Sequence, residues 1–148
     1  MNQTASFKFV VSSVPFTSLW SHDAAEDSWA GYAAEKAALL KVLHTVPNVV
    51  ILSGDRHEFA AIEFNAEGAG WHEVLEFSTS PLSMFYVPLY HTLNMESKEH
   101  VEVIKNSESG EQVTELVPAE KVLSYIPYGI HKWFVRHKKY LLEYSDLS

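Results

Sequence analysis

The pattern of apolar positions predicts a strand, a helix and a second strand at the start of the chain. Residues 7–12 are rich in aromatic and β-branched side chains, which favour a strand. Residues 33–44 consist mainly of Ala, Leu, Glu and Lys, which favour a helix, and their leucines form an apolar stripe. Residues 49–52 are a continuous apolar run, typical of a strand buried on both faces. This order predicts two parallel strands joined by a right-handed crossover.

Further apolar segments predict antiparallel hairpins. Residues 59–64 and 71–78 flank a turn that contains glycine, which favours a hairpin. We expect the face of the second segment that carries Leu75 and Phe77 to point into the core, because alternate residues of a strand share a face. Residues 100–117 contain a second, partly exposed hairpin. The sequence therefore predicts an α/β fold with a strand–helix–strand start and appended β-hairpins.

Composition and charge narrow the class of protein. A chain of 148 residues with 47% hydrophobic and 20% charged residues suits one ordinary domain. The formal charge of -8 disfavours a nucleic-acid binder that neutralises phosphates. With no cysteine, disulfides and thiolate ligands are excluded. No apolar run approaches the ~20 residues that a membrane span needs, and no signal peptide is expected at the N-terminus. The sequence does not indicate the cellular compartment of the protein.

One short motif carries the sharpest chemical signal. Ser53 and Gly54 end the buried strand, and Asp55, Arg56 and His57 follow directly. Residues two apart in an extended loop project to the same side, so Asp55 and His57 can converge on one centre. A carboxylate and an imidazole together suit metal ions such as Fe, Mn or Zn. The alternative is structural: Asp55 caps a turn and His57 forms a hydrogen bond at the surface.

Several ordered motifs resemble the PhoD-like phosphatases, a branch of the calcineurin-like metallophosphoesterase superfamily. The resemblance covers roughly residues 7 to 90 and concerns the C-terminal portion of that family. It rests on Phe-Lys-Phe-Val-Val-Ser-Ser-Val-Pro-Phe (7–16), Asp-Ser-Trp-Ala-Gly-Tyr (27–32), Glu-Lys (35–36), Asn-Val-Val-Ile-Leu-Ser-Gly-Asp-Arg-His-Glu (48–58) and Glu-Phe-Ser-Thr-Ser-Pro-Leu (76–82), with a weaker echo at 125–127.

The resemblance implies a β-sandwich flanked by helices, with divalent or trivalent metal ions (Fe, Ca, Mn or Zn) bound in loops at the ends of two stacked sheets. It implies hydrolysis of a small phosphate ester by metal-activated water. Asp55 and His57 take the metal-binding and catalytic roles, and Arg56 is expected to lie beside the phosphate or to form an ion pair. Asp27 and Trp29 are expected to border the mouth of the site. Alternatively, Asp27 or the following serine caps the helix.

The motif containing Asp55 is expected to be the last metal motif of the superfamily. If it were the first, Gly-Asp-x-x-Asp and Gly-Asn-His motifs should follow, and neither occurs after Glu58. We therefore expect residues 1–128 to be the C-terminal portion of a metallophosphatase domain and residues 129–148 to be a divergent basic tail. A different class of function is a catalytically inactive interaction or regulatory module, which associates with itself or a partner through an incomplete sheet edge.

Overall fold

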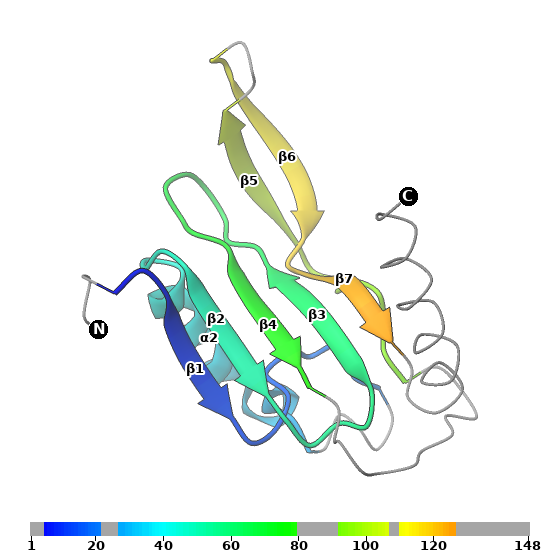
Figure 1. Cartoon of the computed structure of the whole chain (residues 1–148). Coiled ribbons are helices and arrows are strands. Elements are labelled where there is room, and N and C mark those ends of the chain that lie inside the picture. The colour runs from blue at the N-terminus through cyan, green and yellow to red at the C-terminus, as the bar shows by residue number, and fades with distance from the viewer. Residues whose placement is uncertain (1–4, 22–26, 80–91, 107–109, 127–148) are drawn as a thin grey trace, which may run out of the picture.

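A five-stranded sheet forms the centre of the computed structural model, with the strand order β1-β2-β4-β3-β7 (Figure 1). The structure describes residues 5–21, 27–79, 92–106 and 110–126. The strands of this sheet are β1 (Lys8–Ser12), β2 (Val49–Ser53), β3 (Phe59–Phe64), β4 (Val74–Ser78) and β7 (Glu120–Ile126). The first three neighbours, β1, β2 and β4, are parallel, whereas β3 is antiparallel to both β4 and β7.

The strand–helix–strand start is confirmed. The 3-10 helix η1 (Trp29–Tyr32) and the helix α2 (Ala33–Leu43) lie between β1 and β2 in the chain. Both hairpins are confirmed as well: β3 pairs with β4, and β5 (His100–Asn106) pairs with β6 (Gln112–Pro118) in a separate two-stranded sheet. The chain is thus α/β, as expected. The strand β7 was not predicted and extends the main sheet beyond β3.

The predicted inner face of β4 is wrong. Val74, Glu76 and Ser78 are fully buried, whereas Leu75 and Phe77 lie half-buried on the opposite face. The carboxylate of Glu76 is hydrogen-bonded by the chain segment that crosses this side of the sheet. Glu76 therefore occupies a core position, whereas the alternation of apolar residues predicted that its neighbours Leu75 and Phe77 would do so.

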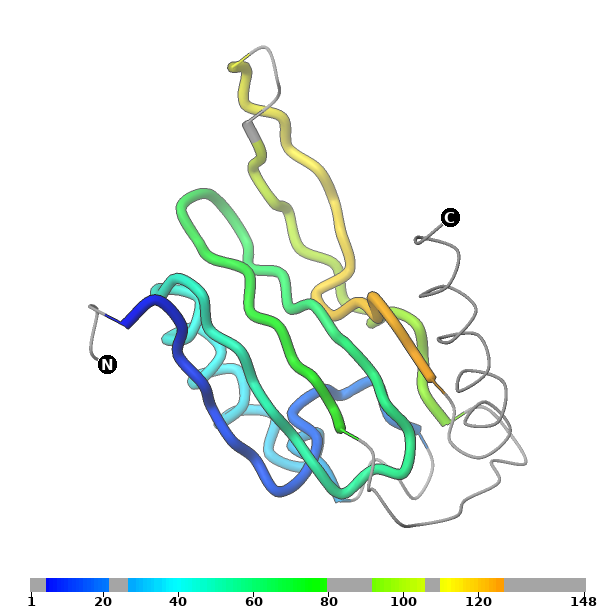
Figure 2. Tube along the Cα trace, in the orientation of Figure 1, coloured from blue at the N-terminus to red at the C-terminus, as the bar shows by residue number. Residues whose placement is uncertain are grey.

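One face of the sheet carries the hydrophobic core. The helix α2 lies on this side, and residues 14–21 cross it from the end of β1 towards β3 (Figures 1 and 2). The fully buried side chains include Phe16, Trp20, Leu43, Ile51 and Phe64. Burying a side chain of this size contributes about 1.5–3 kcal/mol relative to leaving it in water, so this layer is the main source of stability.

The other face of the sheet is apolar across β1, β2 and β4, and no described element covers it (Figure 1). Phe9 and Val11 are 62% and 78% exposed, although they belong to a strand. The half-buried side chains of Val50, Leu52, Leu75 and Phe77 continue this surface across β2 and β4, in register with Phe9 and Val11. We call this surface the open face of the sheet; parallel strands are normally covered on both sides.

Within the described part of the chain, no helix is long and apolar enough to cross a membrane. The predicted boundary between a domain at residues 1–128 and a tail at residues 129–148 stays a prediction, because residues 127–148 lie outside the described residues.

Candidate functional site

The loop between β2 and β3 begins with an unusual backbone conformation. Asp55 has a φ of 72°, and the backbone N–H of Arg56 donates a hydrogen bond of 2.9 Å to the carbonyl of Gly54. A bond between residues two apart, with positive φ at the central residue, defines a strained γ-turn. Residues whose backbone is held in such sparsely populated conformations cluster at functional sites, so the turn makes this loop a candidate site.

Packing at Gly54 favours a residue without a side chain. A Cβ at this position would lie 3.3 Å from the carbonyl oxygen of Ser13, which is a tight contact with backbone. The backbone N–H of Gly54 also donates to the carbonyl of Ser12. The end of β2 is thereby held close to the end of β1, and the turn at Asp55 projects beyond the carboxyl ends of these parallel strands. In open α/β sheets this edge is where ligands bind.

The two predicted metal ligands lie on this loop. Asp55 is exposed and His57 is half-buried. Among the described residues, no group of three or more His, Asp or Glu side chains is arranged to hold a metal ion. The donor set fits the chemistry of a metal that accepts oxygen and nitrogen ligands, but two ligands from this part of the chain do not make a complete site.

Arg56 is held in place by an ion pair, which the sequence analysis left open as an alternative, and by an aromatic ring, which it missed. Its Nη2 donates a hydrogen bond of 3.0 Å to Oε2 of Glu58, and its guanidinium carbon lies 4.6 Å from the ring centroid of Trp20. Glu58 is fully buried, and its Oε1 accepts a hydrogen bond of 2.8 Å from Thr92. Stacking and the ion pair fix the guanidinium beside the turn, with the side chain 18% exposed.

Trp29 lies against the end of β1. Its Nε1 donates a hydrogen bond of 3.2 Å to Oγ of Ser12, and its ring packs on Phe16 with the centroids 5.3 Å apart. This contact places a predicted pocket residue at the same edge of the sheet as the Asp55 turn. Asp27 is exposed; the side chain of Ser28 caps η1 by accepting a hydrogen bond from the N–H of Ala30. Ser28 therefore caps the short 3-10 helix that precedes α2, whereas the N-cap of α2 is Tyr32 and has no side-chain hydrogen bond.

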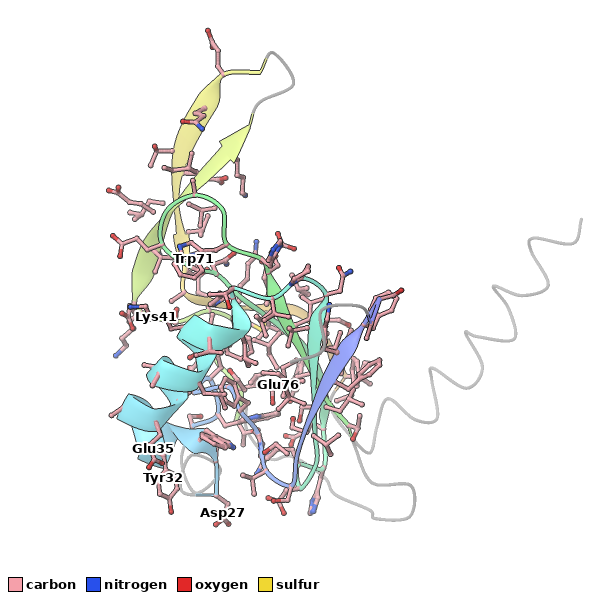
Figure 3. All side chains as sticks on the ribbon, turned by 90° about the vertical axis from the view of Figure 1, so that its left-hand side faces the viewer. Asp27, Tyr32, Glu35, Lys41, Trp71 and Glu76 are labelled. Carbon is pink, nitrogen blue, oxygen red and sulfur yellow. The ribbon has the colours of Figure 1, made fainter. Side chains whose placement is uncertain are left out.

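A buried carboxylate on the core side of the sheet holds the carboxyl end of β2 in place. Glu76 lies between α2 and the strands (Figure 3), and its Oε1 accepts hydrogen bonds from the N–H of Phe16 and the hydroxyl of Ser53. Its Oε2 accepts a bond of 2.8 Å from the N–H of Thr17. Burial raises the pKa of this carboxyl, and the hydrogen bonds oppose that rise. Glu76 ties the crossing segment to the last residue of β2, directly before the Gly54 turn.

The chain is thus an α/β protein with a strained turn at the carboxyl ends of its parallel strands. A family model described as PhoD-like phosphatase matches residues 1–124. The chain therefore belongs to the PhoD-like phosphatase family. Neither the curated proteins nor the solved structures contain a significant match to this chain.

Proposed function

We propose that this chain contributes the last metal-binding loop of a metal-dependent phosphatase that hydrolyses phosphate esters. The strained turn at Asp55 carries the proposal, because it places a carboxylate at the carboxyl end of β2, with His57 two residues on. The metal, when bound, polarises the phosphoryl oxygens and lowers the pKa of a water molecule. Family membership supports the phosphatase class, and the choice of Asp55 and His57 as ligands is ours.

The remaining residues of the loop have distinct roles in this proposal. The guanidinium of Arg56 retains N–H groups that are not used by Glu58 and can bind a phosphate oxygen. Its position is fixed in advance by Glu58 and Trp20, which lowers the entropy cost of binding. Trp29 and Asp27 border the substrate, which is a small phosphate ester.

Metal binding should depend on His57. We expect the purified chain to bind Zn²⁺ or Mn²⁺ weakly in calorimetry, and His57→Ala to weaken binding more than about 10-fold, since even outer partners of a ligand contribute that much. His100→Ala is the matched control, because His100 is an exposed histidine on the separate hairpin. Equal affinity in both variants would remove His57 from the site.

We further propose that this chain supplies only part of the metal site and that the remaining ligands come from elsewhere. Two ligands leave a metal too exposed to fix its geometry, so the chain alone should hydrolyse p-nitrophenyl phosphate near the background rate. Turnover by the purified 148-residue chain that His57→Ala abolishes would show instead that the chain supplies a complete site.

A second candidate function is an interaction module, and the open face of the sheet favours it. Phe7, Phe9 and Ile126 are exposed, and the apolar rows of β2 and β4 beside them are half-buried. Contiguous apolar surface of this kind marks an interface. We propose that a second sheet with an apolar inner face covers it and completes a sandwich, from a longer form of the protein or from another chain.

Polar substitutions on the open face should reduce self-association. Phe9→Ser combined with Val11→Thr should lower binding of the dye ANS and shift the chain towards monomer in light scattering, because both side chains are exposed apolar strand residues. Val113→Thr on β6 is the control, with a valine that is 50% exposed outside this face. A wild-type chain that is monomeric and binds no ANS would contradict the proposal.

A further inference from the structure

A cavity of about 600 Å³ runs along α2 and reaches the end of the sheet opposite the Asp55 turn. Its walls come from α2, the turn between β3 and β4, and the start of β5. Because β3 runs antiparallel to β2 in the sheet, the turn that follows β3 is at the far end from the loop that follows β2. Figure 3 shows Trp71 and Lys41 at this end of α2 and Asp27 at the other.

The cavity has an apolar wall and an aromatic side chain at its rim. Leu40 and Val101 are half-buried in it, and Trp71 is 39% exposed with its indole over Gly68. Pockets for small organic molecules have this size and are lined mainly by apolar and aromatic side chains with a few polar groups. The polar groups then decide which ligand is accepted.

A buried histidine in the wall offers a hydrogen-bond acceptor. His44 is 3% exposed, and its Nδ1 lies 2.6 Å from the carbonyl oxygen of His72. A carbonyl only accepts, so Nδ1 carries the proton and Nε2 bears the lone pair. Burial lowers the pKa of His44, which keeps the ring neutral. Within the described part of the chain, Nε2 has no hydrogen-bond partner.

The charged groups around the cavity favour a cation. Lys36 and Glu120 also line it, but they form an ion pair with each other and are already satisfied. Glu67 and Glu99 are exposed, and no hydrogen bond within the described residues occupies their carboxylates. Lys41 is the one exposed cation that lines the described cavity, so the two carboxylates leave it with an excess of hydrogen-bond acceptors and of negative charge. The formal charge of -8 on the whole chain also favours a cation over an anion.

We propose that this cavity binds a small primary organic ammonium, which donates hydrogen bonds to Glu67 and Glu99 while its carbon chain packs on Trp71 and Leu40. A primary ammonium has the N–H donors that the carboxylates and the acceptor on His44 require. The indole of Trp71 adds a cation–π attraction at the rim. The site is independent of the proposed phosphatase function, because it shares no residue with the Asp55 turn.

The test is calorimetry of the full chain with 1,5-diaminopentane, compared with pentanoate, a carbon chain of the same length with the opposite charge. We expect saturable binding of the diamine with a dissociation constant of about 1 mM and no binding of pentanoate. Glu67→Gln and Glu99→Gln should each weaken binding about two- to five-fold, the usual effect of an exposed ion pair. Trp71→Ala should weaken it by a similar factor.

Two charge changes on α2 make the test decisive. Lys41→Ala removes a like charge from the rim and should strengthen binding of the diamine, whereas an anion site would lose affinity. Glu35→Gln is the matched control; it removes an exposed carboxylate of the same helix that does not line the cavity, and it should leave affinity unchanged (Figure 3). All of these side chains are exposed, so circular dichroism should confirm that the variants keep the fold. No saturable binding, equal binding of pentanoate, or an equal loss in Glu35→Gln would overturn the proposal.

Discussion

Replacing Lys36 by alanine should lower the free energy of unfolding by about 3–5 kcal/mol, because it leaves a buried carboxylate without its cation. The ammonium of Lys36 forms an ion pair with Glu120 and donates to the hydroxyl of Ser18. The two paired side chains are only 7% and 12% exposed. The other carboxylate oxygen of Glu120 accepts from Thr17 and Ser18, so the pair joins α2, β7 and the crossing segment.

Urea unfolding followed by circular dichroism would measure this loss. Lys41→Ala is the matched control on the same helix; Lys41 is exposed, and its substitution should change stability by less than about 0.5 kcal/mol. In a second variant, Lys36→Met with Glu120→Gln, the amide oxygen still accepts from Thr17 and Ser18 while both charges are gone. Much of the lost stability should return. Equal stability of Lys36→Ala and Lys41→Ala would mean that the pair is not buried in solution.

Replacing Glu76 by alanine should destabilise the fold by about 3 kcal/mol or more, because three donors lose their acceptor at once. These donors are the N–H groups of Phe16 and Thr17 and the hydroxyl of Ser53, all in the core-side layer. Each buried donor left without a partner costs about 1–3 kcal/mol. Because Ser53 is the last residue of β2, the loss should also loosen the Asp55 turn.

The same carboxyl should give stability a pH dependence of definite sign. Burial raises the pKa of Glu76 in the folded state above its ordinary value of 4.5. A raised folded pKa means that the folded state holds the proton more tightly than the unfolded state. This contribution to stability is therefore fully present below pH 4.5 and is lost as the pH rises through the folded value. In Glu76→Gln this fall should disappear; an unchanged profile would assign it to another group.

The order of elements followed from local preferences, whereas the long-range polar contacts did not. The helix and the strand β2 were predicted because their residues favour those structures without help from the rest of the chain. The inner face of β4 was mispredicted because the donors that satisfy Glu76 in the core lie 23 to 60 residues away in the sequence. Lys36 lies on the helix one turn before Leu40 and would be expected in water, yet it is buried by a partner 84 residues later.

At the candidate site, too, local features were predicted from the sequence and long-range contacts were not. The spacing of Asp55 and His57 after a buried strand was visible in the sequence, and the structure adds the strained turn beneath it. The anchoring of Arg56 was not visible, because Trp20 lies far away in the sequence and no periodic pattern links it to the loop. The ion pair had one signal in the sequence: Glu58 follows Arg56 by two residues, and a carboxylate at that distance in a loop can reach the guanidinium.

The most direct measurement of the proposed metal site is paramagnetic line broadening by Mn²⁺ in nuclear magnetic resonance spectra of the full chain. Even a weakly bound Mn²⁺ broadens the signals of nearby backbone amides. We predict broadening centred on residues 53–58 at low Mn²⁺ concentration, and its loss in Asp55→Asn combined with His57→Ala. Broadening that centres on exposed carboxylates such as Glu67 and Glu99, or that persists at residues 53–58 in the double variant, would contradict a metal-binding role for this loop.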